Sequence, residues 1–136
     1  MAEFTHFKKD GSAVMVDVHE KPDTYRAASA TGTIQVSPEV FAAVRDHTAK
    51  KGDVLGVARL AGIMGAKKNA ELIPLCHIVP LTNCEVTFTT DENTNSITAV
   101  CTTSCVGKTG VEMEALTGVS TALLTIYDMC KAMDRG

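Results

Sequence analysis

A pair of glutamates and an aspartate–lysine pair stand at the two ends of one apolar segment, residues 111–133. Glu112 and Glu114 open it, thirteen residues without a charge follow, and Asp128 and Lys131 come near its end. The apolar residues recur at alternating spacings of three and four, which predicts a largely buried helix. A charge on such a helix is costly unless it is paired or functional. Asp128 and Lys131 can pair at i, i+3, and spacing alone slightly favours a structural ion pair over an acid–base pair.

Glu112 also has a structural interpretation. Thr109 and Glu112 stand three residues apart, the spacing of a capping box, in which each side chain accepts a hydrogen bond from the other residue's backbone amide. We therefore predict that Thr109 caps the helix and that capping is at least part of the role of Glu112. Glu114 has no such structural role.

Lysines precede helix starts at two places. Lys108 lies in "VGKTG", which fails as a P-loop because Thr102 stands where the motif needs its first glycine. What remains is a lysine with free backbone amides beside a helix start, a place that can hold an anion. Lys51 precedes another helix start in the same way, although most surface lysines are merely solvated.

His77 is held in an irregular segment, "LIPLCHIVPL", between Pro74 and Pro80. A histidine fixed in this way is a candidate for proton transfer or phosphate contact, although lone histidines are more often structural. The neighbouring Cys76 is more often a small buried residue than a nucleophile. The acids, lysines and positioned histidine suit acid–base chemistry on a phosphorylated small molecule, with no metal-ligand set and no Ser/His/Asp order.

Strands and helices alternate in the segments that must position these residues. The residue patterns predict strands at 25–36, 83–90 and 96–106 and helices at 38–51, 54–68 and 111–133. Ser37 and Asp53 are placed to cap the first two helices, and Gly52 to end the first. The order β-α-α-β-β-α predicts an α+β sandwich, in which helices pack on one face of an antiparallel sheet.

The composition is that of one globular domain spanning residues 1–136, in which residues 1–24 form a flexible arm apart from a short strand that "AVMVDV" could make. The net charge of −3 gives no electrostatic footprint for nucleic acid or an anionic membrane. Five cysteines without a CxxC pair indicate neither a disulfide framework nor a structural zinc site. With no signal peptide and no transmembrane segment apparent, we expect a soluble protein of a reducing cytoplasm.

Several stretches together resemble the cyclic pyranopterin monophosphate synthase family of molybdenum cofactor biosynthesis, the MoaC family. They follow in family order and cover nearly all of the chain: "MVDV" at 15–18, "KKGDVLGVARLAGIMGAKK" at 50–68, "LIPLCH" at 72–77, "GKTGVEMEALT" at 107–117 and "LTIYDMCKAM" at 124–133. The resemblance implies a ferredoxin-like α+β fold. It also implies a homohexamer, a trimer of dimers, with the site at a subunit interface. Family members usually continue past Gly136 into a Gly/Lys-rich tail.

The activity that this resemblance implies is conversion of 3′,8-cyclo-7,8-dihydroguanosine 5′-triphosphate to cyclic pyranopterin monophosphate, with release of pyrophosphate and without a cofactor. Matching motifs imply that Asp128 and Lys131 are catalytic, with Lys51 as their partner. The same comparison implies substrate binding by eight residues: Arg26, Lys67, Leu75, Cys76, His77, Glu112, Met113 and Glu114. On this hypothesis Asp128 holds Lys131 in a partly dry pocket for proton transfer.

Two other functions are compatible with parts of the sequence. A non-catalytic nucleotide-binding module would keep the lysines but would not need Asp128. A structural assembly subunit would use the small residues Ala58, Gly62 and Ala66, which share one helix face and let another backbone approach closely.

The spacing of Glu114 and Asp128 adds a prediction about assembly. Fourteen residues apart, they differ by about 40° around a helix and by roughly 21 Å along its axis. One compact site that uses both groups would therefore take the start of this helix from one chain and its end from another.

Overall fold

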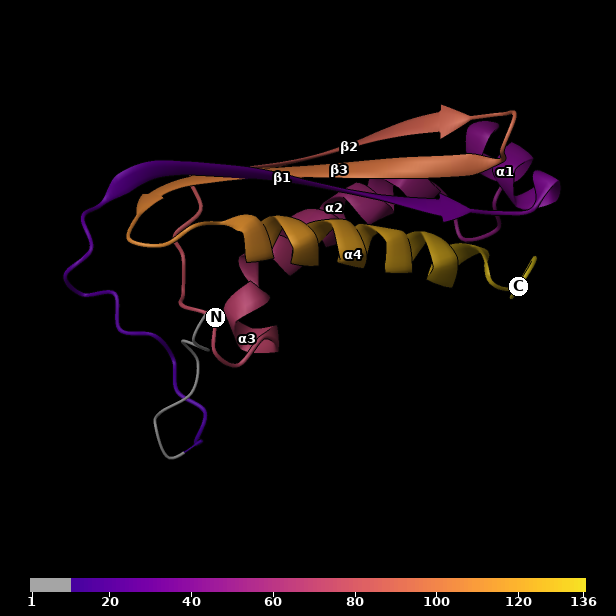
Figure 1. Cartoon of the computed structure of the whole chain (residues 1–136). Coiled ribbons are helices and arrows are strands. Elements are labelled where there is room, and N and C mark those ends of the chain that lie inside the picture. Colours follow the sequence, from indigo (N-terminus) through magenta and orange to yellow (C-terminus); the bar gives the residue numbers. More distant parts are fainter. Residues whose placement is uncertain (1–10) are drawn as a thin grey trace.

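The computed structural model describes residues 11–136 and has an α+β architecture (Figure 1). Its elements, in chain order, are β1 (Thr24–Gln35), α1 (Pro38–Arg45), α2 (Val54–Lys67), α3 (Asn69–Leu72), β2 (Asn83–Asp91), β3 (Ser96–Gly107) and α4 (Glu112–Cys130). The predicted order of strands and helices is confirmed, with the four-residue helix α3 as an addition. Residues 14–18 are loop, so the short strand considered there does not form. The part of the expected flexible arm before residue 11 lies outside the described residues.

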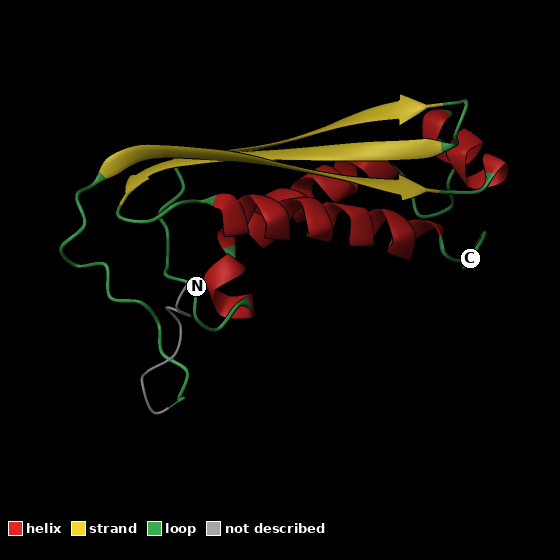
Figure 2. Ribbon diagram, viewed as in Figure 1, coloured by secondary structure: helices red, strands yellow, loops and turns green. Residues whose placement is uncertain are grey.

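The sheet has three antiparallel strands in the order β1-β3-β2. Helices α2 and α4 lie side by side on one of its faces (Figure 2). Along β1, Ala30 and Ile34 pack into the helix-covered core, whereas Thr31 and Thr33 are exposed, as the two-residue period of a strand requires. The predicted one-sided sandwich is confirmed. A ferredoxin-like fold would add a strand after the last helix, and residues 131–136 form none, so that finer assignment stays a prediction.

Small residues let α2 and α4 pack closely, as the sequence predicted. A Cβ atom placed on Gly62 of α2 would lie 3.0 Å from the backbone oxygen of Gly118 on α4. One placed on Gly118 would lie 2.6 Å from Sγ of Cys101, on the strand beneath. Both helices therefore need glycine where they cross, and this contact fixes α4 against the sheet.

The caps of the first two helices are confirmed, but the first helix is shorter than predicted. Ser37 accepts a hydrogen bond from the amide of Val40, and Asp53 accepts one from the amide of Gly56. Helix α1 ends at Arg45 rather than near Gly52 because His47 adopts a left-handed conformation, with φ of 57°. The amides of His47 and Thr48 then bond back to the last turn, which closes a Schellman motif.

No helix within residues 11–136 is both long enough and apolar enough to cross a membrane.

Candidate active site

The predicted site residues gather mainly at the two opposite ends of α4 (Figure 1). The Asp128 cluster consists of Lys51, Asp128 and Lys131, near the C-terminal end of the helix. At the other end lies the Glu114 cluster, which consists of Leu75, Cys76, His77, Glu112, Met113 and Glu114. Because α4 is one uninterrupted helix, roughly 21 Å of helix axis separates Glu114 from Asp128.

Two lysines converge on one carboxylate in the Asp128 cluster. Lys131 Nζ lies 3.0 Å from Asp128 Oδ1, which confirms the predicted i, i+3 pair. Lys51 Nζ, from the loop between α1 and α2, lies 3.9 Å from Asp128 Oδ2 and donates a hydrogen bond to the Asp128 backbone oxygen. The hydrogen bond from Lys131, aided by the charge of Lys51, holds the pKa of Asp128 below its usual value. Asp128 is therefore an ionised group that orients two ammonium groups.

The partly dry pocket expected around Lys131 is not formed by this chain alone. The side chains of Asp128, Lys131 and Lys51 are 60%, 39% and 50% exposed. The last turns of α4 bury Ile126, Met129 and Cys130 in the core, whereas their charged side chains face solvent. Proton transfer by Lys131 in a drier setting would need another surface to cover this cluster.

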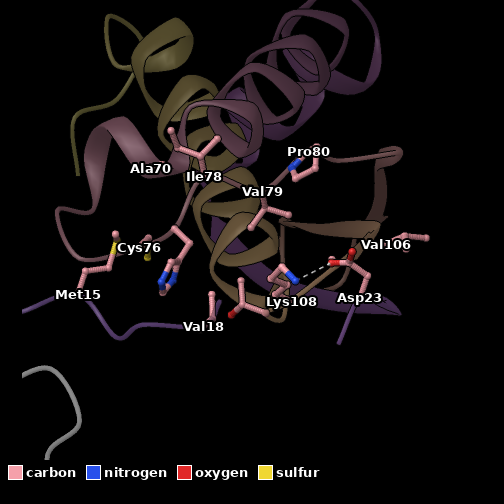
Figure 3. Close-up of a pocket in the computed structure, with 13 residues that line it drawn as sticks. Met15, Val18, Asp23, Ala70, Cys76, Ile78, Val79, Pro80, Val106 and Lys108 are labelled. Atoms are coloured by element: carbon pink, nitrogen blue, oxygen red, sulfur yellow. Dashed lines mark ion pairs between the residues drawn. The ribbon is translucent and has the colours of Figure 1, made fainter. Parts of the chain in front are cut away.

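The six residues of the Glu114 cluster line one cavity of about 140 Å³. Cys76 and His77 also line a larger neighbouring cavity of about 680 Å³, shown in Figure 3. Leu75, Cys76 and Met113 line a third, of about 530 Å³. Cys76 thus lines all three cavities, and the two larger ones are in the size range of small-molecule sites.

Glu114 is the buried acid of this cluster, only 4% exposed. Asn69, from α3, donates a hydrogen bond of 3.2 Å from Nδ2 to Glu114 Oε2. The hydroxyl of Thr117 in turn donates to Asn69 Oδ1 over 2.6 Å. Burial raises the pKa of Glu114, and the nearby charge of Glu112 acts in the same direction. Asn69 therefore fixes a carboxyl group that favours its protonated form more than a free glutamate does.

Asn69 was not predicted as a site residue from the sequence. The residue falls between the end of one predicted helix and the start of the irregular segment, where an Asn is an ordinary turn residue. The one available signal was its place directly after the two lysines that end a stretch carrying the family resemblance. Its role depends on the contact with α4, which is distant in sequence.

The N-terminal arm helps to build the larger cavity. His77 donates its Nε2 hydrogen to the backbone oxygen of Val16, because a carbonyl can only accept. Met15 and Val18 line the same cavity (Figure 3). The stretch "MVDV" at 15–18 is therefore bound to the segment that holds Cys76 and His77.

A lysine stands on the opposite wall of this cavity. Lys108 Nζ lies 3.8 Å from Asp23 Oδ1 and donates to the backbone oxygen of Lys21. Figure 3 shows this ion pair among the residues that line the hollow. Lys108 is thus a cation that lines the cavity. Its sequence position was compatible both with anion binding and with a merely solvated lysine.

The predicted capping box at the start of α4 is wrong. Val111 occupies the N-cap position, and no side chain caps the helix. Buried Thr103, on β3, donates its hydroxyl to the backbone oxygen of Val111 over 3.0 Å, which ties the start of the helix to the sheet. Glu112 therefore lies in the first turn, and its carboxylate folds over Gly110 at the cavity.

Lys67 and Arg26 do not line the 140 Å³ cavity of the Glu114 cluster. Lys67 lines a separate hollow of about 260 Å³ beside Cys84, at the start of β2. Arg26 donates from Nε to the backbone oxygen of Gly107 over 3.0 Å, and Gly107 lines the larger cavity. Arg26 thus supports the cavity wall, whereas Lys67 could be reached only by a substrate that extends beyond the cavities of the Glu114 cluster.

Among residues 11–136, no group of three or more His, Cys, Asp or Glu side chains is placed to hold a metal ion.

Comparison with known proteins matches the chain to a protein family and to many curated proteins. A family model described as "MoaC family" matches residues 15–136. The chain is also similar to a protein of Clostridium botulinum (strain Alaska E43 / Type E3), named cyclic pyranopterin monophosphate synthase. The two are 56% identical over 133 residues, which cover 98% of this chain and 84% of that protein.

Proposed function

The chain belongs to the MoaC family, and we propose that it is an enzyme that converts 3′,8-cyclo-7,8-dihydroguanosine 5′-triphosphate to cyclic pyranopterin monophosphate, releasing pyrophosphate. The observation that carries this proposal is the 56% identity, over 98% of the chain, to a relative named cyclic pyranopterin monophosphate synthase. The reaction is a step of molybdenum cofactor biosynthesis. The five unpaired cysteines suit a reducing compartment, and we place the reaction in the cytoplasm.

The Asp128 cluster supplies the acid–base chemistry in this proposal. Lys131 moves protons as the purine-derived ring opens and is rebuilt, and Asp128 holds its ammonium group through the 3.0 Å ion pair. Lys51 binds triphosphate oxygens and offsets the charge that develops as pyrophosphate leaves. The convergence of both lysines on one carboxylate supports this division of roles.

The Glu114 cluster binds the substrate in this proposal. Glu114 and Glu112 bind donor groups of the base, while Leu75 and Met113 supply apolar walls. His77 and Lys108 face the larger cavity, where they bind phosphate oxygens. Arg26 stabilises the wall, and Lys67 contacts an outlying part of the substrate. No added cofactor is used.

We further propose that each site combines the Glu114 cluster of one chain with the Asp128 cluster of another. Two chains packed with their α4 helices antiparallel would bring opposite ends of the helix together twice, as a two-fold interface requires. The exposed apolar side chains of α2 and α4 support such packing: Val57, Leu60, Met64, Leu116, Leu124 and Tyr127. The partner's surface would also exclude water from Lys131. Three such dimers make the expected homohexamer.

Release of pyrophosphate from the cyclic dihydro-GTP intermediate tests this function. The purified protein should release one pyrophosphate for each pterin product formed. A nucleotide-binding module would bind the intermediate without turnover, and a structural subunit would neither bind it nor gain thermal stability from it. Either result would contradict the proposed activity.

A further inference from the structure

Cys84 and Cys101 bring two sulfur atoms into contact on the core face of the sheet. In the register of β2 and β3, Cys84 faces Thr103 and Cys101 faces Val86, so the cysteines are diagonal neighbours. Their Sγ atoms are 3.9 Å apart. Cys105 and Cys130 are buried and Cys76 is half-buried, and no such sulfur contact involves them within the described part of the chain.

The two thiols differ in access. Cys101 is fully buried, and its sulfur lies against Gly118 of α4. Cys84 is half-buried and lines the 260 Å³ hollow that also holds Lys67. The hydrogen bond from Cys101, together with the charge of Lys67, outweighs burial and lowers the pKa of Cys84 to about 7. Cys84 is therefore an accessible thiol in an electropositive hollow, with a second thiol directly behind it.

We propose that Cys84 and Cys101 form a peroxide-sensitive thiol pair, in which Cys84 is the reacting thiol and Cys101 the resolving one. The Cys84 thiol loses its proton, and the thiolate attacks one oxygen of hydrogen peroxide. The O–O bond breaks, and the hydroxide that leaves becomes water by taking up a proton in place of the one that Cys84 released, so Cys84 becomes a sulfenic acid. The Cys101 sulfur then attacks the Cys84 sulfur and displaces the hydroxyl group, which leaves as water with the Cys101 proton. In total, two thiols are oxidised to a disulfide, and one peroxide is reduced to two waters.

The geometry requires movement of the two strands as well as of the side chains, because diagonal neighbours in a sheet lie about 7–8 Å apart, whereas a disulfide joins residues whose Cα atoms are about 4.4–6.8 Å apart. A disulfide bond is about 2.05 Å long, so the two sulfurs must approach by roughly 1.9 Å from their present separation of 3.9 Å. Rotation of Cys84 toward Cys101 supplies part of this approach, because Cys84 borders an open hollow. Cys101 is held by Gly118, and its movement would loosen that contact with α4. The inference does not rest on the proposed enzymatic activity.

Controlled oxidation of the reduced, full-length protein tests the pair. After limited treatment with hydrogen peroxide, titration should show two of the five thiols lost, and the intact mass should fall by about 2 Da, for two hydrogens. Peptide mapping without reduction should find a bond between Cys84 and Cys101, and dithiothreitol should reverse it. Unchanged thiols, a different pairing, or a disulfide between chains would overturn the proposal.

Two variants separate the roles of the pair. In Cys101→Ser, a sulfenic-acid probe such as dimedone should label Cys84 at least about tenfold faster than Cys76, Cys105 or Cys130. Cys84→Ser should keep its four remaining thiols under the same treatment. Cys130→Ser is the matched control, and it should still form the bond. If Cys101→Ser fails to fold, mapping of the unmodified sequence still decides. Labelling of another cysteine ahead of Cys84 would contradict the assignment.

Discussion

The two ends of α4 place acidic side chains in opposite surroundings. At the first, Glu114 is 4% exposed and held by Asn69; at the second, the Asp128 side chain is 60% exposed and held by lysines. Burial raises the pKa of Glu114, whereas the hydrogen bond from Lys131 lowers that of Asp128. The helix face does not cause this contrast, because the two positions differ by only about 40° around the axis. The cause is what packs over each end, since α3 and the loop after it cover only the first.

This contrast shows that neither end is a complete site. The Glu114 cluster offers cavities, but the one lysine within residues 11–136 that lines them, Lys108, is paired with Asp23. The Asp128 cluster offers two lysines on an open surface. An anionic substrate that needs both enclosure and cations would be served by joining the two, which is the physical basis of the proposed site between chains.

Removal of either member of the ion pair should have the largest effect. Lys131→Ala and Asp128→Ala should each lower kcat by at least about 100-fold, because proton transfer loses its acid or the group that orients it. The fold should persist, since both side chains are exposed. Steady-state kinetics and circular dichroism measure the two outcomes. Near-normal turnover in either variant would make the pair merely structural.

Lys51→Ala should have the next largest effect, a loss in kcat/KM of roughly tenfold to a hundredfold, because a cation near the triphosphate is removed. Lys50→Ala is its matched control. Lys50 is an exposed neighbour that makes no ion pair among residues 11–136. Equal losses in the two variants would mean that general positive charge, rather than the contact of Lys51 with Asp128, matters.

Asn69→Ala should act through stability. It leaves the buried Glu114 carboxyl and the Thr117 hydroxyl without their partner, which should lower the free energy of unfolding by about 1–3 kcal/mol. Asn93→Ala, in the exposed hairpin turn, should change it by less than about 0.5 kcal/mol. Urea denaturation measures both. If Asn69→Ala lowered the free energy of unfolding by as little as the control does, Asn69 would not be what stabilises the Glu114 end of α4.

Glu114→Gln should have the smallest effect on the stability of the fold, and this effect should depend most on pH. The folded state raises the pKa of this carboxyl above its usual 4.5, so ionised Glu114 destabilises the fold at pH values above the folded pKa. This penalty disappears below the unfolded pKa, where the group is protonated in both states. Glu114→Gln should therefore raise the melting temperature at about pH 7 and leave it unchanged near pH 4. The same gain at both values would exclude ionisation as the cause.

Two helix caps and the ion pair near the end of α4 were predictable from residue types and spacing alone. Ser37 and Asp53 are the caps expected from their types, and Asp128 and Lys131 pair as helix spacing requires. The end of α1 was missed because His47, not a glycine, takes the left-handed position.

Features that depend on distant contacts were not predictable from local patterns. The capping box predicted at Thr109 followed from sequence spacing alone, whereas Val111 is the N-cap and its backbone oxygen accepts a hydrogen bond from Thr103 on β3. Asn69 was missed for the same reason, since its partners come from α4. The opposite exposures of Glu114 and Asp128 also follow from tertiary packing, which a helical wheel does not contain.

Mixed oligomers test most directly our proposal that each site joins the two ends of α4 from different chains. Glu114→Ala and Asp128→Ala are each expected to be inactive. Unfolded together in equal amounts and refolded, they should regain about a quarter of wild-type turnover, the fraction of sites that receive both intact clusters at random. Differently tagged chains purified through both tags would verify mixing. No turnover in verified mixed oligomers would mean that each site lies within one chain, and would contradict the proposal.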